Sequence, residues 1–249
     1  MNASFSISNF GNNTLTISCG ELARLANGST VISYGDTVLL ATACMSKEPR
    51  PSGGFLPLFV DYQEKTYAMG KIPGGYIKRE GRPKDAEILS SRLIDRPIRP
   101  LFPKGLTNEI QVVAMVLSSD GKNDPDILAI NGASSALYIS DIPFDNPVGA
   151  VRISKKSGEF TLNPTYEERE GAIMDLVVVG TEEKIVMLEG QLTEVSEAEV
   201  LGAIGFAHPF IRQIIELQKK LREEAGKEKK QVELSKIDEN ILKRVNEHV

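Results

Sequence analysis

A cluster of cations beside one aromatic residue is the part of this sequence best suited to phosphate chemistry. Residues 70–105 hold nine lysines and arginines against four acids, in a chain whose formal net charge is −5. Near the start of this stretch, glycines bracket the tip Tyr76-Ile77-Lys78-Arg79. Bases of single-stranded nucleic acid stack on flat side chains while cations hold the phosphates. The pattern indicates an RNA-contacting tip, and it also suits a solvated surface loop.

More arginines follow on a predicted helix. Pro83 suits its first turn, and Pro97 is expected to end it. Its buried face is predicted from helical spacing to be Ala86, Leu89 and Leu93. The planar guanidinium groups suited to phosphate are those of Arg92, Arg96 and Arg99. The alternative is that these arginines pair with Glu87, with Asp95 or with a neighbouring subunit.

Other chemistry is sparse in the sequence. His208 lies in the apolar run F-A-H-P-F and is predicted to be a core histidine. No phosphate-binding loop, dinucleotide motif or metal-ligand cluster is visible. Asp61, Asp141 and Asp175 stand without a second carboxylate in pattern, so no metal pair can be assigned. The residues alone predict no catalytic centre and no metal site within this chain.

The bulk composition limits the class of protein. With 249 residues, 41% of them hydrophobic, the chain suffices for one large domain or a domain plus an appendage. No run approaches the ~20 apolar residues of a membrane helix, and no signal peptide is visible. Cys19 and Cys44 lack CxxC spacing and are predicted to be reduced core residues of a cytoplasmic protein.

The order of predicted elements is that of a mixed α+β protein. Gly35-Asp36 joins two β-branched runs and predicts a hairpin, whose second strand is apolar on both faces and therefore central. Helices are predicted over 126–140, where small residues allow close packing, and from Ser196 onward. The predicted strands are 14–19, 30–34, 37–45, 55–62, 109–117, 148–154, 159–162, 174–179 and 184–189. Residues 223–233 are predicted to form an exposed linker or a solvated helix face.

Two motifs carry a family resemblance. G-K-I-P-G-G-Y-I-K-R-E-G-R-P followed by S-R-L-I-D-R-P-I-R-P-L-F-P resembles the first core domain of bacterial polynucleotide phosphorylases. The strings N-G-A-S-S-A-L and M-D-L-V-V-V-G-T agree as well. The resemblance covers about residues 10–215, and the remainder is similar to the start of that family's all-helical middle domain.

The resemblance implies a fold and an activity. The fold would be RNase PH-like, with a mixed sheet, packed helices and a helical C-terminal segment. The whole protein would be a homotrimeric ring that threads single-stranded RNA and degrades mRNA from its 3′ end. Inorganic phosphate would release nucleoside diphosphates, the reverse reaction would polymerise them, and magnesium would assist. Neither DNA nor a membrane is an expected partner.

The resemblance also places residues. It carries RNA contact onto Tyr76, Ile77, Lys78, Arg79, Arg82, Arg92, Arg96 and Arg99. It does not carry catalysis, because the active second domain has two aspartates six apart and a lysine two positions later. Here Asp175 has Arg169 six positions before it and Val177 two after it. Where the active domain holds phosphate with serines, this chain has Asp124-Pro125-Asp126, which would repel phosphate.

We therefore predict a fragment with two parts. Residues 1–215 would be the first RNase PH-like core domain, and 216–249 the linker and the start of a helical domain, ending without a cap or partner. The fragment alone is predicted to be inactive, because the catalytic centre and its magnesium ligands would lie in the second core domain. One alternative is a stand-alone, non-catalytic RNA-binding subunit of a ring. A self-sufficient nuclease is disfavoured by the missing aspartate and lysine.

Overall fold

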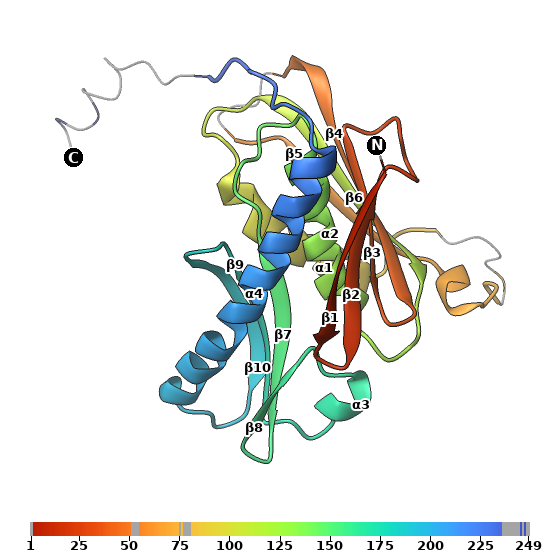
Figure 1. Cartoon of the computed structure of the whole chain (residues 1–249), viewed down its shortest axis with the longest axis vertical. Coiled ribbons are helices and arrows are strands. Elements are labelled where there is room, and N and C mark those ends of the chain that lie inside the picture. Colours follow the sequence, from red (N-terminus) through yellow and green to blue (C-terminus); the bar gives the residue numbers. More distant parts are fainter. Residues whose placement is uncertain are drawn as a thin grey trace.

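The computed structural model describes residues 2–50, 55–74, 76, 81–235, 245 and 247. Two sheets and four α-helices make up the described part (Figure 1). The strands are β1 (Ala3–Phe10), β2 (Asn13–Cys19), β3 (Gly28–Tyr34), β4 (Thr37–Pro49), β5 (Leu58–Glu64), β6 (Asn108–Ser118), β7 (Gly149–Lys156), β8 (Glu159–Leu162), β9 (Met174–Gly180) and β10 (Ile185–Leu192). The helices are η1 (Thr66–Met69), α1 (Asp85–Ile98), η2 (Arg99–Leu101), α2 (Pro125–Ile139), α3 (Tyr166–Arg169) and α4 (Glu197–Ala225).

The larger sheet has the order β1-β2-β3-β4-β6-β5, and β5 is parallel to β6 while the other pairs are antiparallel. The smaller sheet has the order β10-β9-β7-β8 and is antiparallel throughout. The hairpin at Gly35-Asp36 is confirmed, and β4 is an interior strand as predicted. The strands predicted from the sequence did not include β1, although its sequence A-S-F-S-I-S-N-F has the two-residue period of a strand.

Helix α2 lies between the two sheets and is buried on nearly all sides (Figure 1). The predicted role of its small residues is borne out at Gly132. A Cβ placed there would lie 3.1 Å from Ala41 Cβ and 3.3 Å from Ile32 Cγ2. A larger residue would therefore push the helix away from β3 and β4. Asp124 takes the N-cap position, but its carboxylate makes no capping bond and is used elsewhere.

Helix α1 differs from the prediction in the face it buries. Leu89 is 62% exposed and Ala86 is exposed, whereas Ile94 and Ile98 are fully buried. The periodicity identified a helix, but it could not say which side would meet the sheet. Pro97 lies inside the helix, which ends one residue later at Ile98. The predicted stop was therefore slightly early.

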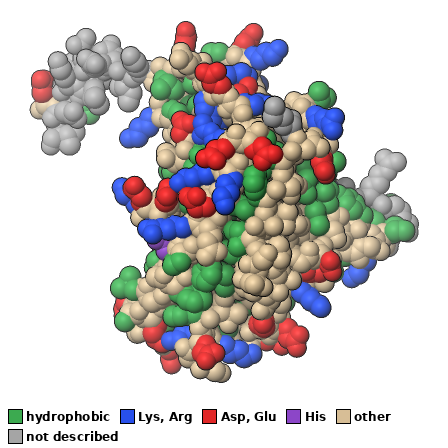
Figure 2. Space-filling model, in the orientation of Figure 1, with side chains coloured by type: hydrophobic (Ala, Val, Ile, Leu, Met, Phe, Trp, Pro, Cys, Tyr) green, Lys and Arg blue, Asp and Glu red, His purple; other side chains and the backbone are tan. Residues whose placement is uncertain are grey.

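Helix α4 begins with a capping box between Ser196 and Glu199. Its length and mean hydropathy of 1.2 would allow it to cross a membrane, but Ala207, Ile211 and Ile214 pack into the core of this chain. On the face in Figure 2, acidic and basic side chains are interspersed over the upper half of this helix. The boundary predicted after Ile215 falls within α4, which continues to Ala225, and its position stays a prediction.

The segment after α4 is not a free linker. Lys227 N–H donates to the Ile139 carbonyl and Lys230 N–H to the Asp141 carbonyl, both at 2.8 Å. Further along, Leu234 pairs with Leu106. We call residues 226–235 the strap. Residues 223–233 are mostly exposed, as predicted, and from Lys227 onward the backbone of the strap is also bonded to the core. Most of the helix predicted from Ile237 lies outside the described residues.

Two minor predictions also meet the structure. Cys19 is buried, but Cys44 is exposed, so the prediction that both cysteines are core residues is wrong for Cys44. The cause is the alternation of β4, in which successive side chains face opposite sides. His208 is half-buried, and its Nε2 lies 3.3 Å from the Thr181 carbonyl oxygen.

Candidate functional site

The segment that contains η1, which precedes the predicted RNA-contacting tip, forms an arm that projects from the larger sheet (Figure 1). At the base of this arm, Ser119 N–H donates to the Ala68 carbonyl at 2.8 Å, which fixes η1 to the end of β6. Tyr76 is completely exposed and Ile72 is 90% exposed. Ile77, Lys78 and Arg79 lie outside the described residues, so their proposed contact with RNA stays a prediction.

The four predicted arginines have different surroundings. Arg82 and Arg92 are exposed, and neither has a hydrogen-bond or ion-pair partner in the described part of the chain. Arg96 is exposed and pairs with Glu189 of β10 at 2.7 Å. Two of the four guanidinium groups are thus available to an external anion without first breaking a contact.

Arg99 binds groups of its own chain and is not available to a ligand unless those bonds are broken. Its guanidinium binds both carboxylate oxygens of Asp95, at 2.7 and 2.8 Å. It also donates to the carbonyls of Leu56 and Leu58, each at 3.0 Å. The alternative of a pair with Asp95 is therefore realised. These bonds fasten the end of α1 to the start of β5.

We expect Arg99→Ala to lower the free energy of unfolding by about 1–3 kcal/mol, because a part-buried charged hydrogen-bond network is lost. Arg92→Ala, on the same helix and without a partner, should change it by less than about 0.5 kcal/mol. Urea unfolding of both variants measures the difference. Equal stability of the two variants would contradict a structural role for Arg99.

An ion cluster, which we define as Asp124, Asp126, Asp175, Arg152 and Arg169, lies between the start of α2 and the smaller sheet. Arg152 reaches all three aspartates, at 2.9 Å to Asp124, 3.0 Å to Asp126 and 2.9 Å to Asp175. Arg169 binds Asp124 at 2.9 Å and Asp175 at 3.1 Å. The two arginine side chains are only 12% and 16% exposed. Each carboxylate is therefore already paired with at least one arginine of the chain.

The ion cluster carries one more acid than base, and this affects its protonation. Burial, together with the nearby Asp124 carboxylate, raises the pKa of Asp126 to about 6, although Arg152 opposes the shift. Burial alone would lower the pKa of the Arg152 guanidinium, but Asp126, Asp124 and Asp175 together raise it. Asp126 therefore takes up a proton as the pH falls toward 6.

The cluster brings together residues that the sequence flagged separately. Asp124, Asp126, Asp175 and Arg169 were considered one by one, but Arg152 was missed. A signal existed, since Arg152 stands between the buried residues Val151 and Ile153 of β7. A charged residue inside an apolar run is rarely buried without partners.

A pocket of about 380 Å³ opens above the ion cluster. Asp126, Arg152 and Asp175 line one side, and Leu89 and Leu93 of α1 line the other. This explains why the predicted apolar stripe of α1 is exposed: it borders the open pocket. Arg152 and Arg169 already bind the carboxylate oxygens that a magnesium ion would need as ligands, so the ion cluster does not fit that metal. The described residues contain no group of three or more His, Cys, Asp or Glu arranged to hold a metal.

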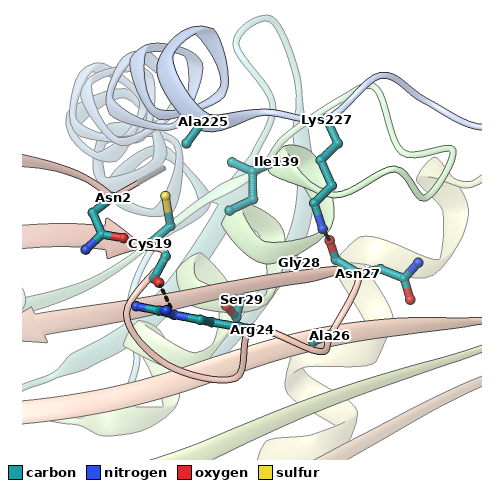
Figure 3. A pocket seen from close by; sticks show the side chains of 11 residues that line it. Asn2, Cys19, Arg24, Ala26, Asn27, Gly28, Ser29, Ile139, Ala225 and Lys227 are labelled. Atoms are coloured by element: carbon teal, nitrogen blue, oxygen red, sulfur yellow. Dashed lines mark hydrogen bonds between the residues drawn. The ribbon is translucent and has the colours of Figure 1, made fainter.

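A second cavity, of about 360 Å³, lies beside the strap (Figure 3). Lys227 Nζ donates to the Asn27 carbonyl at 2.6 Å, and Arg24 Nε donates to the Gly20 carbonyl at 3.1 Å. Ile139 and Ala225 close the cavity from α2 and α4 (Figure 3). Both cations are thus partly used within the chain, and the cavity marks where the strap crosses the loop after β2.

Comparison with known proteins decides the family. Residues 13–143 match the family model RNase PH, described as the 3′ exoribonuclease family, domain 1. Residues 146–209 match the companion model for domain 2 of that family. The chain belongs to the 3′ exoribonuclease family. The two matches meet between α2 and β7, where the chain passes from the larger sheet to the smaller one.

Several relatives of this chain are polyribonucleotide nucleotidyltransferases. Those of Solibacter usitatus and Persephonella marina are each 52% identical, over 94% and 91% of this chain. That of Heliobacterium modesticaldum is 51% identical over 95%. The chain spans about a third of the length of these relatives, 34%, 32% and 33% respectively.

The fold also agrees with a solved structure. The crystal structure of rice (Oryza sativa) Rrp46 superposes with a TM-score of 0.66 at 18% sequence identity, covering 82% of this chain and 92% of that one. The predicted RNase PH-like fold, with sheets, packed helices and a C-terminal helix, is confirmed.

Proposed function

We propose that this chain is the RNA-guiding, non-catalytic part of a 3′-to-5′ phosphorolytic exoribonuclease. The whole enzyme would use inorganic phosphate to release nucleoside diphosphates from single-stranded RNA, and it would polymerise them in reverse. Support comes from relatives at about 50% identity that are polyribonucleotide nucleotidyltransferases. The described residues support a division of labour in which this part holds RNA and another part does the chemistry.

The observation that carries the non-catalytic role is the ion cluster. Phosphate would have to approach Asp124, Asp126 and Asp175, which together outnumber their two arginine partners. At short range in a partly buried site, like charges repel by several kcal/mol. The arginines that might attract phosphate are fully engaged by these carboxylates. The pocket therefore lacks the donors that phosphorolysis requires.

The guiding role is supported by the arm and by α1. Tyr76 offers an exposed ring for stacking, and Arg82 and Arg92 offer unpaired guanidinium groups for phosphates. These residues lie in the one strongly basic stretch of an acidic chain. RNA would be attracted to this surface alone, which is the behaviour expected of an entry path.

The first test of this function is an activity assay. The pure 249-residue chain, incubated with polyadenylate, inorganic phosphate and magnesium, should release no adenosine diphosphate above the blank. The same preparation should bind a fluorescent oligoadenylate, and Tyr76→Ala should weaken that binding. Release of diphosphate would contradict the non-catalytic role. Failure to bind RNA would contradict the guiding role.

The remaining features of the proposal concern the whole protein. It would form a homotrimeric ring in the cytoplasm and take part in mRNA degradation. Magnesium would assist the reaction through ligands outside this chain, because the aspartates of the ion cluster are bound by Arg152 and Arg169. Neither DNA nor a membrane is a proposed partner. Sedimentation of the whole protein at several concentrations tests the trimer.

A further inference from the structure

The outer edge of β5 is closed by side chains of α1. Ile110 N–H donates to the Pro57 carbonyl at 2.9 Å, so the backbone groups of odd-numbered residues in this strand face β6. Those of even-numbered residues must then face the open edge of the sheet. Three side chains of α1 and its C-cap bind this edge. Arg99, the C-cap, donates to the Leu58 carbonyl (3.0 Å), Ser91 accepts from Tyr62 N–H (2.9 Å) and Glu87 accepts from Glu64 N–H (2.9 Å).

Val60 is the even-numbered residue between Leu58 and Glu64 whose backbone is not bound by such a side chain. Its N–H and C=O point to the same edge as those of Leu58 and Tyr62, but no residue in the described part of the chain binds them. A groove of about 370 Å³ lies at this point, between β5 and α1. An open backbone donor beside an open acceptor matches the hydrogen-bonding edge of a nucleobase.

The walls of the groove provide the other groups that a nucleotide needs. Phe59 is 55% exposed and Ile88 is 48% exposed, so an apolar ring surface faces the opening. Arg92 also lines the groove and has no partner among the described residues. Asp61 Oδ2 accepts from Gln63 Nε2 at 2.5 Å, and its other oxygen has no such partner in the described part.

We propose that this groove binds one nucleotide of single-stranded RNA. The base stacks on Phe59 and meets the backbone of Val60, Arg92 takes the phosphate, and Asp61 accepts the 2′-hydroxyl. Arg99 and Asp95 also line the groove but neutralise each other, which leaves one free cation and one free carboxylate. That balance fits a nucleotide. The inference rests on the proposed function and adds residues to it.

A docked protein strand fits this edge less well. Strand addition requires a continuous row of open backbone groups. Here the Leu58 carbonyl and the N–H groups of Tyr62 and Glu64 are already bound by side chains, so the row of open groups is interrupted on both sides of Val60. An interrupted row cannot pair along its length with an added strand, whereas the open donor and acceptor of Val60 suffice for one base.

The central experiment removes the stacking surface. Phe59→Ala should weaken binding of a fluorescent oligoadenylate RNA by about 5- to 150-fold, the equivalent of one lost base stack. Phe59→Tyr keeps a ring and should bind like the unchanged chain. Leu201→Ala, which removes a 67% exposed apolar side chain from α4, is the matched control and should have no effect. Thermal melts establish that each variant is folded.

Two further variants test the polar contacts. Asp61→Asn should reduce the ratio of RNA affinity to DNA affinity, measured with oligoadenylate and oligodeoxyadenylate, because a 2′-hydroxyl acceptor is weakened. Arg92→Ala should weaken both ligands and flatten the salt dependence of binding by about one phosphate contact. This exposed residue also provides a test of the groove if Phe59→Ala fails to fold.

Three results would overturn the proposal. The first is unchanged RNA affinity in both Phe59→Ala and Arg92→Ala. The second is loss of self-association in Phe59→Ala with RNA affinity intact, which would assign the groove to a protein partner. The third is no RNA binding by the unchanged chain, which would also overturn the guiding role. If Tyr76→Ala weakens binding and the groove variants do not, only the groove proposal fails.

Discussion

Replacing Arg152 with methionine is expected to lower the free energy of unfolding by about 3–5 kcal/mol. Arg152 contacts Asp124, Asp126 and Asp175, whereas Arg169 contacts only the first and the last. The substitution leaves Asp126 without an ion-pair partner among the described residues, with Arg169 as the remaining cation that acts on it. Breaking a buried ion network in this way costs more than the network contributes, because an uncompensated charge remains buried.

The measurement is urea unfolding at pH 8, with Arg96→Met as the matched control. Arg96 pairs with Glu189 at 2.7 Å, but its side chain is 62% exposed, so its loss should cost less than about 1 kcal/mol. The loss of unfolding free energy in Arg152→Lys should lie between those of the two methionine variants. One ammonium group cannot bind three carboxylates as the planar guanidinium group does. Similar losses for Arg152→Met and Arg96→Met would mean that the ion cluster is solvated.

The second large effect is a pH dependence that belongs to Asp126. Burial and the neighbouring Asp124 carboxylate raise its pKa in the folded chain to about 6, well above the ordinary value of an aspartate. A raised pKa means that the folded state binds the proton more tightly, so this group stabilises the fold below pH 4. That stability is lost as the pH rises through about 6.

Asp126→Asn removes this titration. The stability of the variant minus that of the unchanged chain should therefore rise by about 1–3 kcal/mol between pH 4 and pH 7. Glu199→Gln gives the opposite sign, because a hydrogen bond from Lys155 lowers the pKa of Glu199 to about 2. That carboxylate stabilises the fold at neutral pH and loses its effect in acid. A flat difference for Asp126→Asn would show that the cluster titrates as free carboxylates do.

Local patterns predicted the elements of this fold well. Gly35-Asp36 gave the β3–β4 hairpin, and the small residues near Gly132 gave a helix that packs closely on the sheet. These features depend on neighbours in the sequence. The buried face of α1 was wrong because it depends on a long-range partner: Glu87 is buried in order to bind Glu64 N–H, a contact 23 residues away.

The candidate sites also include one that depends on neighbours in the sequence and others that depend on long-range contacts. The exposed ring of Tyr76 could be predicted from the glycines around it and the cations beside it. The ion cluster could not, because Arg152 and Asp175 come from different strands that pair only in the folded smaller sheet. Likewise, the open backbone of Val60 follows from the strand register and from the spacing of α1 side chains along β5. Neither is visible in the amino-acid sequence.

The strap has a mechanical consequence. Lys229 Nζ donates to the carbonyls of Leu137, Tyr138 and Ser140 at 2.8–3.0 Å, at the carboxyl end of α2. Ser235 N–H donates to the Gly105 carbonyl, so these attachments stand in series along the strap. Tension applied at Ser235 would have to break them one after another before reaching α4. The hydrogen bonds of the strap therefore protect the packing of α4 from a force applied at Ser235.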